Sequence, residues 1–180
     1  RDIYFYRGLS YIQLNQNAEA ELDLEKYLSL AQDTDYNKSQ TLLEFAIVKF
    51  YLNDRNEALI NLNKVIETIP LETSPYAYRG VIHYENKSYR EAIEDLNIGI
   101  KSGFFGNKLY LYRGNSKFYL GQYDAALKDF NTYLSRNPKN KDNLYDAHIN
   151  RSIIFYTLEY YEDALKDVNQ ALEIKNDDGE

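Results

Sequence analysis

YLYRGNSKFYLGQYDAALKDFNTYLSRNP, residues 110–138, is the stretch of sequence that decides the fold. Apolar residues recur on both sides of Gly121 at the spacing of a helix face. Glycine at this point suits a left-handed helix C-cap, and Asp124 is placed to complement the dipole of a helix that starts after it. Pro138 then ends that second helix. The stretch therefore predicts a pair of antiparallel helices joined by a tight turn.

The same pattern repeats along the chain. Tyr112-Arg113-Gly114 recurs as Tyr6-Arg7-Gly8 and as Tyr78-Arg79-Gly80, and the register places small residues at Gly8, Ala46, Gly80, Gly114 and Ser152. Twelve residues after each small residue stands an alanine: Ala20, Ala58, Ala92, Ala126 and Ala164. Four residues later stands a core-type residue: Leu24, Leu62, Leu96, Phe130 and Val168. Five units of one helix pair are therefore predicted, and such a period is typical of a solenoid.

The small residues and the spacings lead to two further expectations. Helix axes approach closely only where side chains are short, so we expect Gly8, Gly80 and Gly114 to meet the alanines of their own second helices. The small residues are 34 residues apart between units two and four but 38 apart at the first and last junctions. The difference is about one helical turn, and we expect a lengthened helix at each of these two junctions.

These residues resemble the tetratricopeptide repeat family, and the resemblance covers nearly the whole chain. The fourth unit, for example, matches the family pattern with Tyr110, Gly114, Phe118, Tyr123, Ala126, Phe130 and Pro138. The resemblance implies an all-α fold, a right-handed α-solenoid of antiparallel helix pairs in a single array. The expected repeats are approximately 1–34, 39–72, 73–106, 107–140 and 145–178. The resemblance also implies that a protein or peptide partner binds a concave groove lined by the first helices.

Family geometry implies which side chains line that groove. They are Tyr6, Leu9, Glu44, Ile47, Tyr51, Tyr78, Val81, Lys108, Tyr112, Asn115, Tyr119 and Asn150. Tyrosine offers contact area and a hydroxyl group at low entropic cost, which suits an interface. The alternative is that some rings pack between adjacent repeats. We favour packing for the row Phe50, Tyr84, Phe118 and Tyr156, and binding for Tyr6, Tyr78 and Tyr112. No three consecutive units hold the side chains of the clamp with which some family members bind chaperone tails.

Comparison of the five units with one another predicts a charge pair. Arginine precedes the small residue in four units, and sixteen residues after each arginine stands an aspartate. The pairs are Arg7–Asp23, Arg79–Asp95, Arg113–Asp129 and Arg151–Asp167. In the second unit the two positions hold Phe45 and Asn61, so both charges disappear together. We expect a structural pair between the two helices of each unit, because an uncompensated buried charge is costly. The alternative is that the arginines bind a ligand carboxylate.

Composition excludes several classes of function. The net charge of −7 makes a nucleic-acid partner unexpected. No apolar stretch approaches the ~20 residues that span a bilayer, so we expect no membrane insertion. There is no cysteine, and the two histidines, His83 and His148, lack a second ligand at metal-binding spacing. Residues 103–106 lack the lysine of a phosphate-binding loop. We expect no cofactor, no metal and no catalysis.

The leading hypothesis is therefore a scaffold that takes a peptide or helix of a partner protein in its groove. One alternative is a self-association module that forms homo-oligomers through the ends of the solenoid, which need polar caps for solubility. Another is the regulatory portion of a larger enzyme. Because the chain starts at Arg1 and contains no methionine, we expect a fragment that lacks its N-terminus, and a cytoplasmic location. The abundance of Asn, Lys, Ile and Tyr suggests a bacterial, AT-rich genome.

Overall fold

The structure is a computed structural model that describes residues 1–32, 35, 37–103 and 105–176. These residues form ten α-helices and one short 3-10 helix, and no strand occurs among them. In chain order the helices are α1 (Asp2–Gln13), α2 (Asn17–Leu30), α3 (Lys38–Tyr51), α4 (Arg55–Thr68), α5 (Ser74–Glu85), α6 (Tyr89–Gly99), η1 (Ile100–Ser102), α7 (Lys108–Tyr119), α8 (Tyr123–Ser135), α9 (Lys141–Thr157) and α10 (Tyr161–Asn176). None of the helices in the described ranges is both long and apolar enough to cross a membrane.

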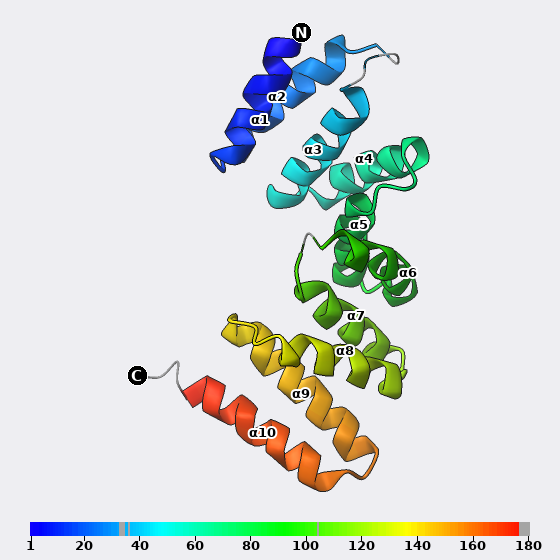
Figure 1. The fold of residues 1–180 in the computed structure, drawn as a ribbon, viewed down its shortest axis with the longest axis vertical. Helices are drawn as coiled ribbons and strands as arrows, with labels where there is room; N and C mark the ends of the chain where they lie inside the picture. Colours follow the sequence, from blue (N-terminus) through cyan, green and yellow to red (C-terminus); the bar gives the residue numbers. More distant parts are fainter. Residues whose placement is uncertain (33–34, 36, 104, 177–180) are drawn as a thin grey trace.

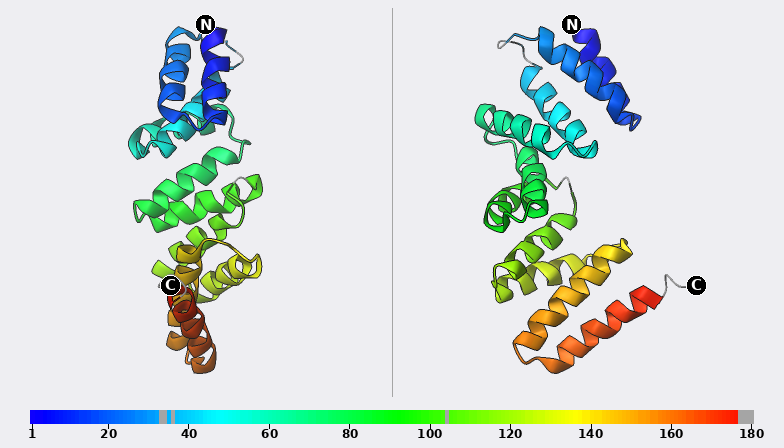
Figure 2. Two further views of the ribbon diagram at one scale, coloured as in Figure 1. Left: turned by 90° about the vertical axis from the view of Figure 1, so that its left-hand side faces the viewer. Right: turned by 180° about the vertical axis from the view of Figure 1, so that it is seen from behind.

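The helices are arranged as antiparallel pairs that follow one another along the long axis of the molecule, from the N-terminus at one end towards the C-terminus at the other (Figures 1 and 2). Each odd-numbered helix packs against the next even-numbered helix, and the two form a unit. From α3 onwards, each odd-numbered helix also packs against the second helix of the unit before it. Successive first helices, α1 to α9, also contact one another. The prediction of an all-helical solenoid is confirmed.

The turn inside each unit uses one left-handed residue at a constant position. This residue is Asn15, Asn53, Lys87, Gly121 or Glu159, each with φ between 57° and 71°. Glycine and asparagine adopt this conformation readily, whereas lysine and glutamate adopt it at a cost. The backbone therefore keeps the register even where the side chain does not favour it.

The core follows the repeated positions. The alanines Ala20, Ala58, Ala92 and Ala126 are fully buried, as are the large residues Leu24, Leu62, Leu96 and Phe130. In the last unit Val168 occupies the same position as these large residues but is 36% exposed. No following helix pair covers it within the described residues. The buried residues form three clusters, each of which joins neighbouring units, and the packing becomes shallow on the outer side of α10.

The close contact inside a unit differs from the expected one. A Cβ atom at Gly8 would lie 2.8 Å from Cδ2 of Leu24, and one at Gly114 would lie 3.0 Å from the ring of Phe130. Gly80 faces Leu96 in the same way. The nearest neighbours are thus the large residues four positions after the alanines, and the prediction that the alanines make this contact is wrong. A large side chain fills the space that glycine leaves, which gives denser packing than two small residues would.

The four-residue insertions at the first and last junctions have different structural outcomes. At the last junction α9 is 17 residues long, compared with 12 for α5 and α7, so the insertion lengthens this helix as predicted. At the first junction α3 gains only two residues over α5. Most of that insertion lies in the connection 31–37, of which residues 33, 34 and 36 lie outside the described part. The predicted repeat ends at 34 and 178 also fall outside the described residues.

Candidate peptide-binding groove

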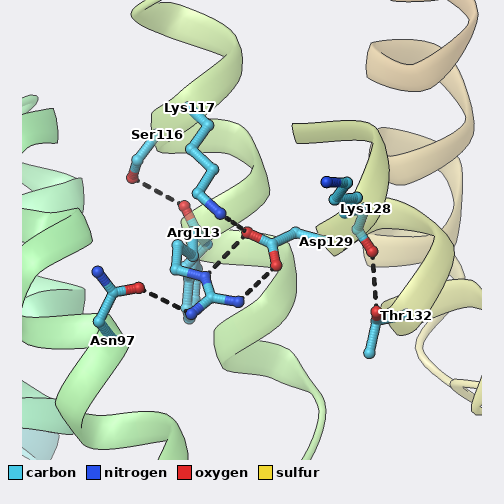
Figure 3. A network of polar contacts seen from close by, with 8 residues as sticks. Asn97, Arg113, Ser116, Lys117, Lys128, Asp129 and Thr132 are labelled. Carbon is cyan, nitrogen blue, oxygen red and sulfur yellow. Dashed lines mark hydrogen bonds and ion pairs between the residues drawn. The ribbon is translucent and has the colours of Figure 1, made fainter. Parts of the chain in front are cut away.

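An arginine holds the two helices of a unit together, and unit four shows the arrangement most clearly (Figure 3). Arg113 on α7 donates from Nε and Nη2 to the two carboxylate oxygens of Asp129 on α8, at 2.9 and 2.6 Å. Lys117, one turn further along α7, donates to the same carboxylate at 2.7 Å. Two parallel bonds of this kind match the planar guanidinium to the carboxylate. The contact fixes how α7 crosses α8.

The predicted arginine and aspartate meet in all four units that contain them. The two bonds from Arg7 to Asp23 are 2.6 and 2.7 Å, and those from Arg151 to Asp167 are both 2.6 Å. Arg79 binds Asp95 at 2.7 and 2.8 Å. Each of these arginines therefore has its aspartate as an ion-pair partner within its own unit, which favours the structural interpretation over the ligand clamp. In the second unit Phe45 is buried instead, and Asn61 donates to the backbone oxygen of Glu57 at 2.9 Å.

The sequence comparison missed a third member of this contact. The remaining guanidinium nitrogen, Nη1, donates to an asparagine on the second helix of the preceding unit. Arg79 reaches Asn63 at 2.7 Å, Arg113 reaches Asn97 at 2.8 Å, and Arg151 reaches Asn131 at 2.6 Å. Each asparagine stands seventeen residues after the small residue of its own unit, and this constant position was the available signal. The arginine therefore also connects neighbouring units.

Both histidines lie beside aspartates of these arginine–aspartate pairs. His148 Nδ1 lies 2.9 Å from Asp167 Oδ1, and His83 Nε2 lies 3.7 Å from Asp95 Oδ2. Burial raises the pKa of Asp167, but hydrogen bonds from Arg151 and His148 outweigh it and hold that pKa below its usual value. No group of three or more metal-ligating side chains occurs in the part of the chain that the structure describes.

The groove face is defined here as the surface of the first helices that carries the twelve predicted groove residues. Its N-terminal half contains two hollows that meet at Glu44. One, of about 470 Å³, is lined from α1, the start of α2, α3 and α5, and includes Glu44, Ile47, Tyr51 and Tyr78. The other, of about 300 Å³, runs from Gln40 along α3 to the start of α5 and Ser102. The structure thus brings four predicted residues together around two adjoining hollows.

Four of the residues predicted to line the groove are buried, namely Ile47, Tyr78, Val81 and Asn115, and two of them are packed deep inside the protein. Tyr78 is 0% exposed and Val81 1% exposed. Phe105, from the connection before α7, places its ring 4.7 Å from that of Tyr78, and the Phe50 ring lies 5.2 Å from Tyr78 and 6.3 Å from Phe105. Tyr78 was predicted to form part of an open binding surface, and this prediction is wrong. Its ring is packed beneath the groove face, between α3 and the connection before α7. Residues 103–106, which lack the lysine of a phosphate-binding loop, form part of the connection between η1 and α7, and of these Phe104 lies outside the described residues.

In the C-terminal half of the groove face, side chains of neighbouring units contact one another through aromatic rings and hydrogen bonds. Tyr84 and Tyr112 lie with ring centroids 5.0 Å apart, and Asn115 donates to the Tyr84 hydroxyl at 3.2 Å. Asn150 donates in turn to Asn115 at 2.9 Å. The Tyr119 ring stacks on Tyr89 at 4.7 Å. These rings therefore pack between units, and Asn115 is itself buried. Packing was also predicted for Tyr156, but its side chain is 69% exposed, because no further unit covers it within the described residues.

Several predicted residues do present surface. Tyr6, Tyr51 and Tyr119 are each more than half exposed, at 64%, 57% and 54%. Leu9, Lys108 and Tyr112 are partly exposed, and Lys108 lies over the Tyr112 ring at 5.3 Å. The groove face thus offers exposed tyrosines at three points, and one of them, Tyr51, lines the larger hollow at Glu44.

Comparison with known proteins agrees with this architecture. Two family models described as tetratricopeptide repeat match the chain, one over residues 111–179 and one over residues 2–34. Comparison with curated protein sequences gave no match. Among solved structures, "MamA MSR-1 C2" superposes with a TM-score of 0.77 at 18% identity, covering 97% of this chain and 96% of that one. "MamA 41-end from Desulfovibrio magneticus RS-1" gives 0.76 at 14% identity, covering 98% and 95%.

At these identities the likeness to the solved structures is one of fold. The repeated register, the stacked helix pairs and the two family matches at opposite ends of the chain all lead to the same assignment. The chain belongs to the tetratricopeptide repeat family.

Proposed function

We propose that this chain is a protein-interaction scaffold that binds a peptide or helix of a partner protein along its groove face. The carrying observation is the pair of adjoining hollows at Glu44, walled by Ile47 and by the half-exposed ring of Tyr51. Concave surfaces are the usual places for ligand binding, and these two hollows combine apolar side chains with polar and acidic ones. The repeat fold supports this proposal, because stacked units create an extended surface of this kind.

The exposed tyrosines supply the binding test. Phage-displayed random peptides are selected on the wild-type chain, and the affinity of a selected peptide is measured by fluorescence anisotropy. Replacing Tyr51 and Tyr119 together by alanine should weaken binding by about tenfold or more, since buried aromatic anchors dominate interface energies. Tyr160→Ala, which removes an equally exposed ring in the turn before α10, is the matched control and should bind as the wild type. Selection of no peptide, or equal loss in the control, would reject the groove.

Self-association is a second candidate, which a specific observation favours. A hollow of about 460 Å³ on α9 and α10 is lined by Ile153, Tyr156, Leu165 and Val168, among others. At the other end of the described chain Ile3 is exposed, although Leu109 and Ala147 at the same position are buried. Asn169 on α10 stands where Asn63, Asn97 and Asn131 bind an arginine of the following unit. In a head-to-tail contact Asn169 would face Arg7 of a second copy. Arg7 binds Asp23 through Nε and Nη2, as the other arginines bind their aspartates, and those arginines use Nη1 for the asparagine.

Sedimentation velocity tests this candidate. If copies join head to tail, the wild-type sedimentation coefficient should increase with protein concentration, because such a contact does not close on itself. Leu165→Lys should weaken association by about tenfold or more, since it places a charge in the apolar contact. Leu71→Lys, an exposed leucine in the connection between α4 and α5, is the control and should leave association unchanged. A concentration-independent monomer would exclude this candidate.

A further inference from the structure

Glu44 differs from the other members of its row on the groove face. The residue two positions before the small residue of each unit is Tyr6, Glu44, Tyr78, Tyr112 or Asn150, so Glu44 is the charged member. It stands in the middle of α3 and lines both adjoining hollows. A carboxylate at the junction of two hollows is placed to contact whatever occupies them.

The carboxylate of Glu44 is incompletely satisfied by the fold. Gln40, one turn earlier on α3, donates to Oε1 at 2.6 Å. Burial raises the pKa of Glu44, and this hydrogen bond only partly offsets that effect. None of the described residues that line the two hollows is a lysine, arginine or histidine. Leaving a partly buried carboxylate without a cation costs stability, so a purely structural role would not favour it.

Two basic residues near this part of the chain, Lys49 and Arg55, bind other carboxylates. Lys49, on the same helix as Glu44, donates to Glu21 at 2.5 Å and lies 3.6 Å from Asp54. Arg55, which follows the next turn, binds Glu85 at 2.6 Å. The smaller hollow holds a second carboxylate, Glu72, which accepts from the Ser74 hydroxyl at 2.8 Å. The two hollows are therefore lined by carboxylates and by no basic side chain among the described residues, and Lys49 and Arg55 are already bound to other carboxylates.

We propose that Glu44 binds the ammonium or guanidinium group of one lysine or arginine side chain of the partner peptide. This inference rests on the proposed function of the groove face and names what that face selects. The aliphatic stem of a lysine or arginine would pack against Ile47, while its charged head reaches the carboxylate. The exposed ring of Tyr51 is placed beside the same hollow and can hold a cation over its face. The partner segment is therefore a peptide with one basic residue between apolar residues.

Peptide selection tests the charge preference directly. Phage-displayed random peptides are selected in parallel on the wild-type chain and on Glu44→Gln. The wild type should enrich peptides that share a lysine or arginine at one fixed position. Glu44→Gln should still enrich peptides with the apolar residues, but without a basic residue at that position. Glutamine keeps the shape of the side chain and can still accept from Gln40, so circular dichroism and thermal melting should match the wild type.

A double-variant cycle then isolates the contact. One selected peptide is synthesised with its lysine and with norleucine, which keeps the stem and removes the charge. Replacing either Glu44 by glutamine or the lysine by norleucine should weaken binding by about tenfold, and making both changes should add little more. The norleucine peptide requires no change in the protein, so the result does not depend on how the variant folds.

The outcomes separate this inference from the groove proposal. If the wild type enriches peptides without a basic residue, or if Glu44→Gln leaves the ratio of lysine to norleucine affinity unchanged, the cation site is rejected while the groove stands. If the wild type enriches no peptide, the groove proposal fails, and the cation site fails with it.

Discussion

Replacing Asp129 by alanine should lower the free energy of unfolding by about 3 kcal/mol, because it leaves two cations without their anion. Arg113 and Lys117, whose side chains are only 17% and 15% exposed, both bind this carboxylate. Asn97 would still accept from Arg113, but it carries no charge. Urea unfolding followed by circular dichroism at the helix band measures the difference.

The second unit provides the control for this prediction. Asn61 stands at the position of Asp129, is buried, and makes hydrogen bonds only with Glu57. Asn61→Ala should therefore cost about 1 kcal/mol, the value of an ordinary hydrogen bond. The double variant Arg113→Phe with Asp129→Asn copies the second unit and should lose less stability than Asp129→Ala. Equal losses for Asp129→Ala and Asn61→Ala would show that the charge pair does not hold the helices.

Replacing Gly99 by alanine should also lower the free energy of unfolding, by about 3 kcal/mol. A Cβ atom there would lie 2.5 Å from Cα and 2.7 Å from the backbone nitrogen of Ala77 on α5. Backbone atoms inside a helix cannot move aside without shifting the whole helix. Helix propensity alone would give the opposite sign, since alanine is favoured over glycine by ~1 kcal/mol. Thermal and urea unfolding of the variant decide between the two effects.

Gly114→Ala is the matched control. Its added Cβ would approach the ring of Phe130 at 3.0 Å, which is a side-chain contact that can give way by a small rotation. The gain in helix propensity should offset much of the strain, so the net loss should be about 1 kcal/mol or less. If Gly99→Ala is as mild as Gly114→Ala, the close approach of α6 to α5 is not required for stability.

The groove face was the part least accessible to sequence reasoning. The twelve predicted residues occupy repeated positions of the first helices, but they differ in solvent exposure. The Tyr51 side chain is exposed, whereas the Tyr78 side chain is covered by Phe50 and Phe105. Phe105 belongs to no repeated position, so comparison of the units could not place it. Likewise, the pattern could identify Glu44 as a groove residue but not the hollows on either side of it.

The sequence by itself determined the register of this protein, and with it the helix pairs and the arginine–aspartate contacts. Positions sixteen residues apart within a unit face each other whenever both helices form, so Arg113 and Asp129 could be paired from their joint loss in the second unit. Only the tertiary structure decided what meets across units and in the connections: the bond from Arg113 to Asn97, the large side chains opposite the glycines, and Phe105 over Tyr78. Those contacts depend on how one helix pair is rotated on the next and on the path of an irregular segment, and neither has a period that a sequence displays.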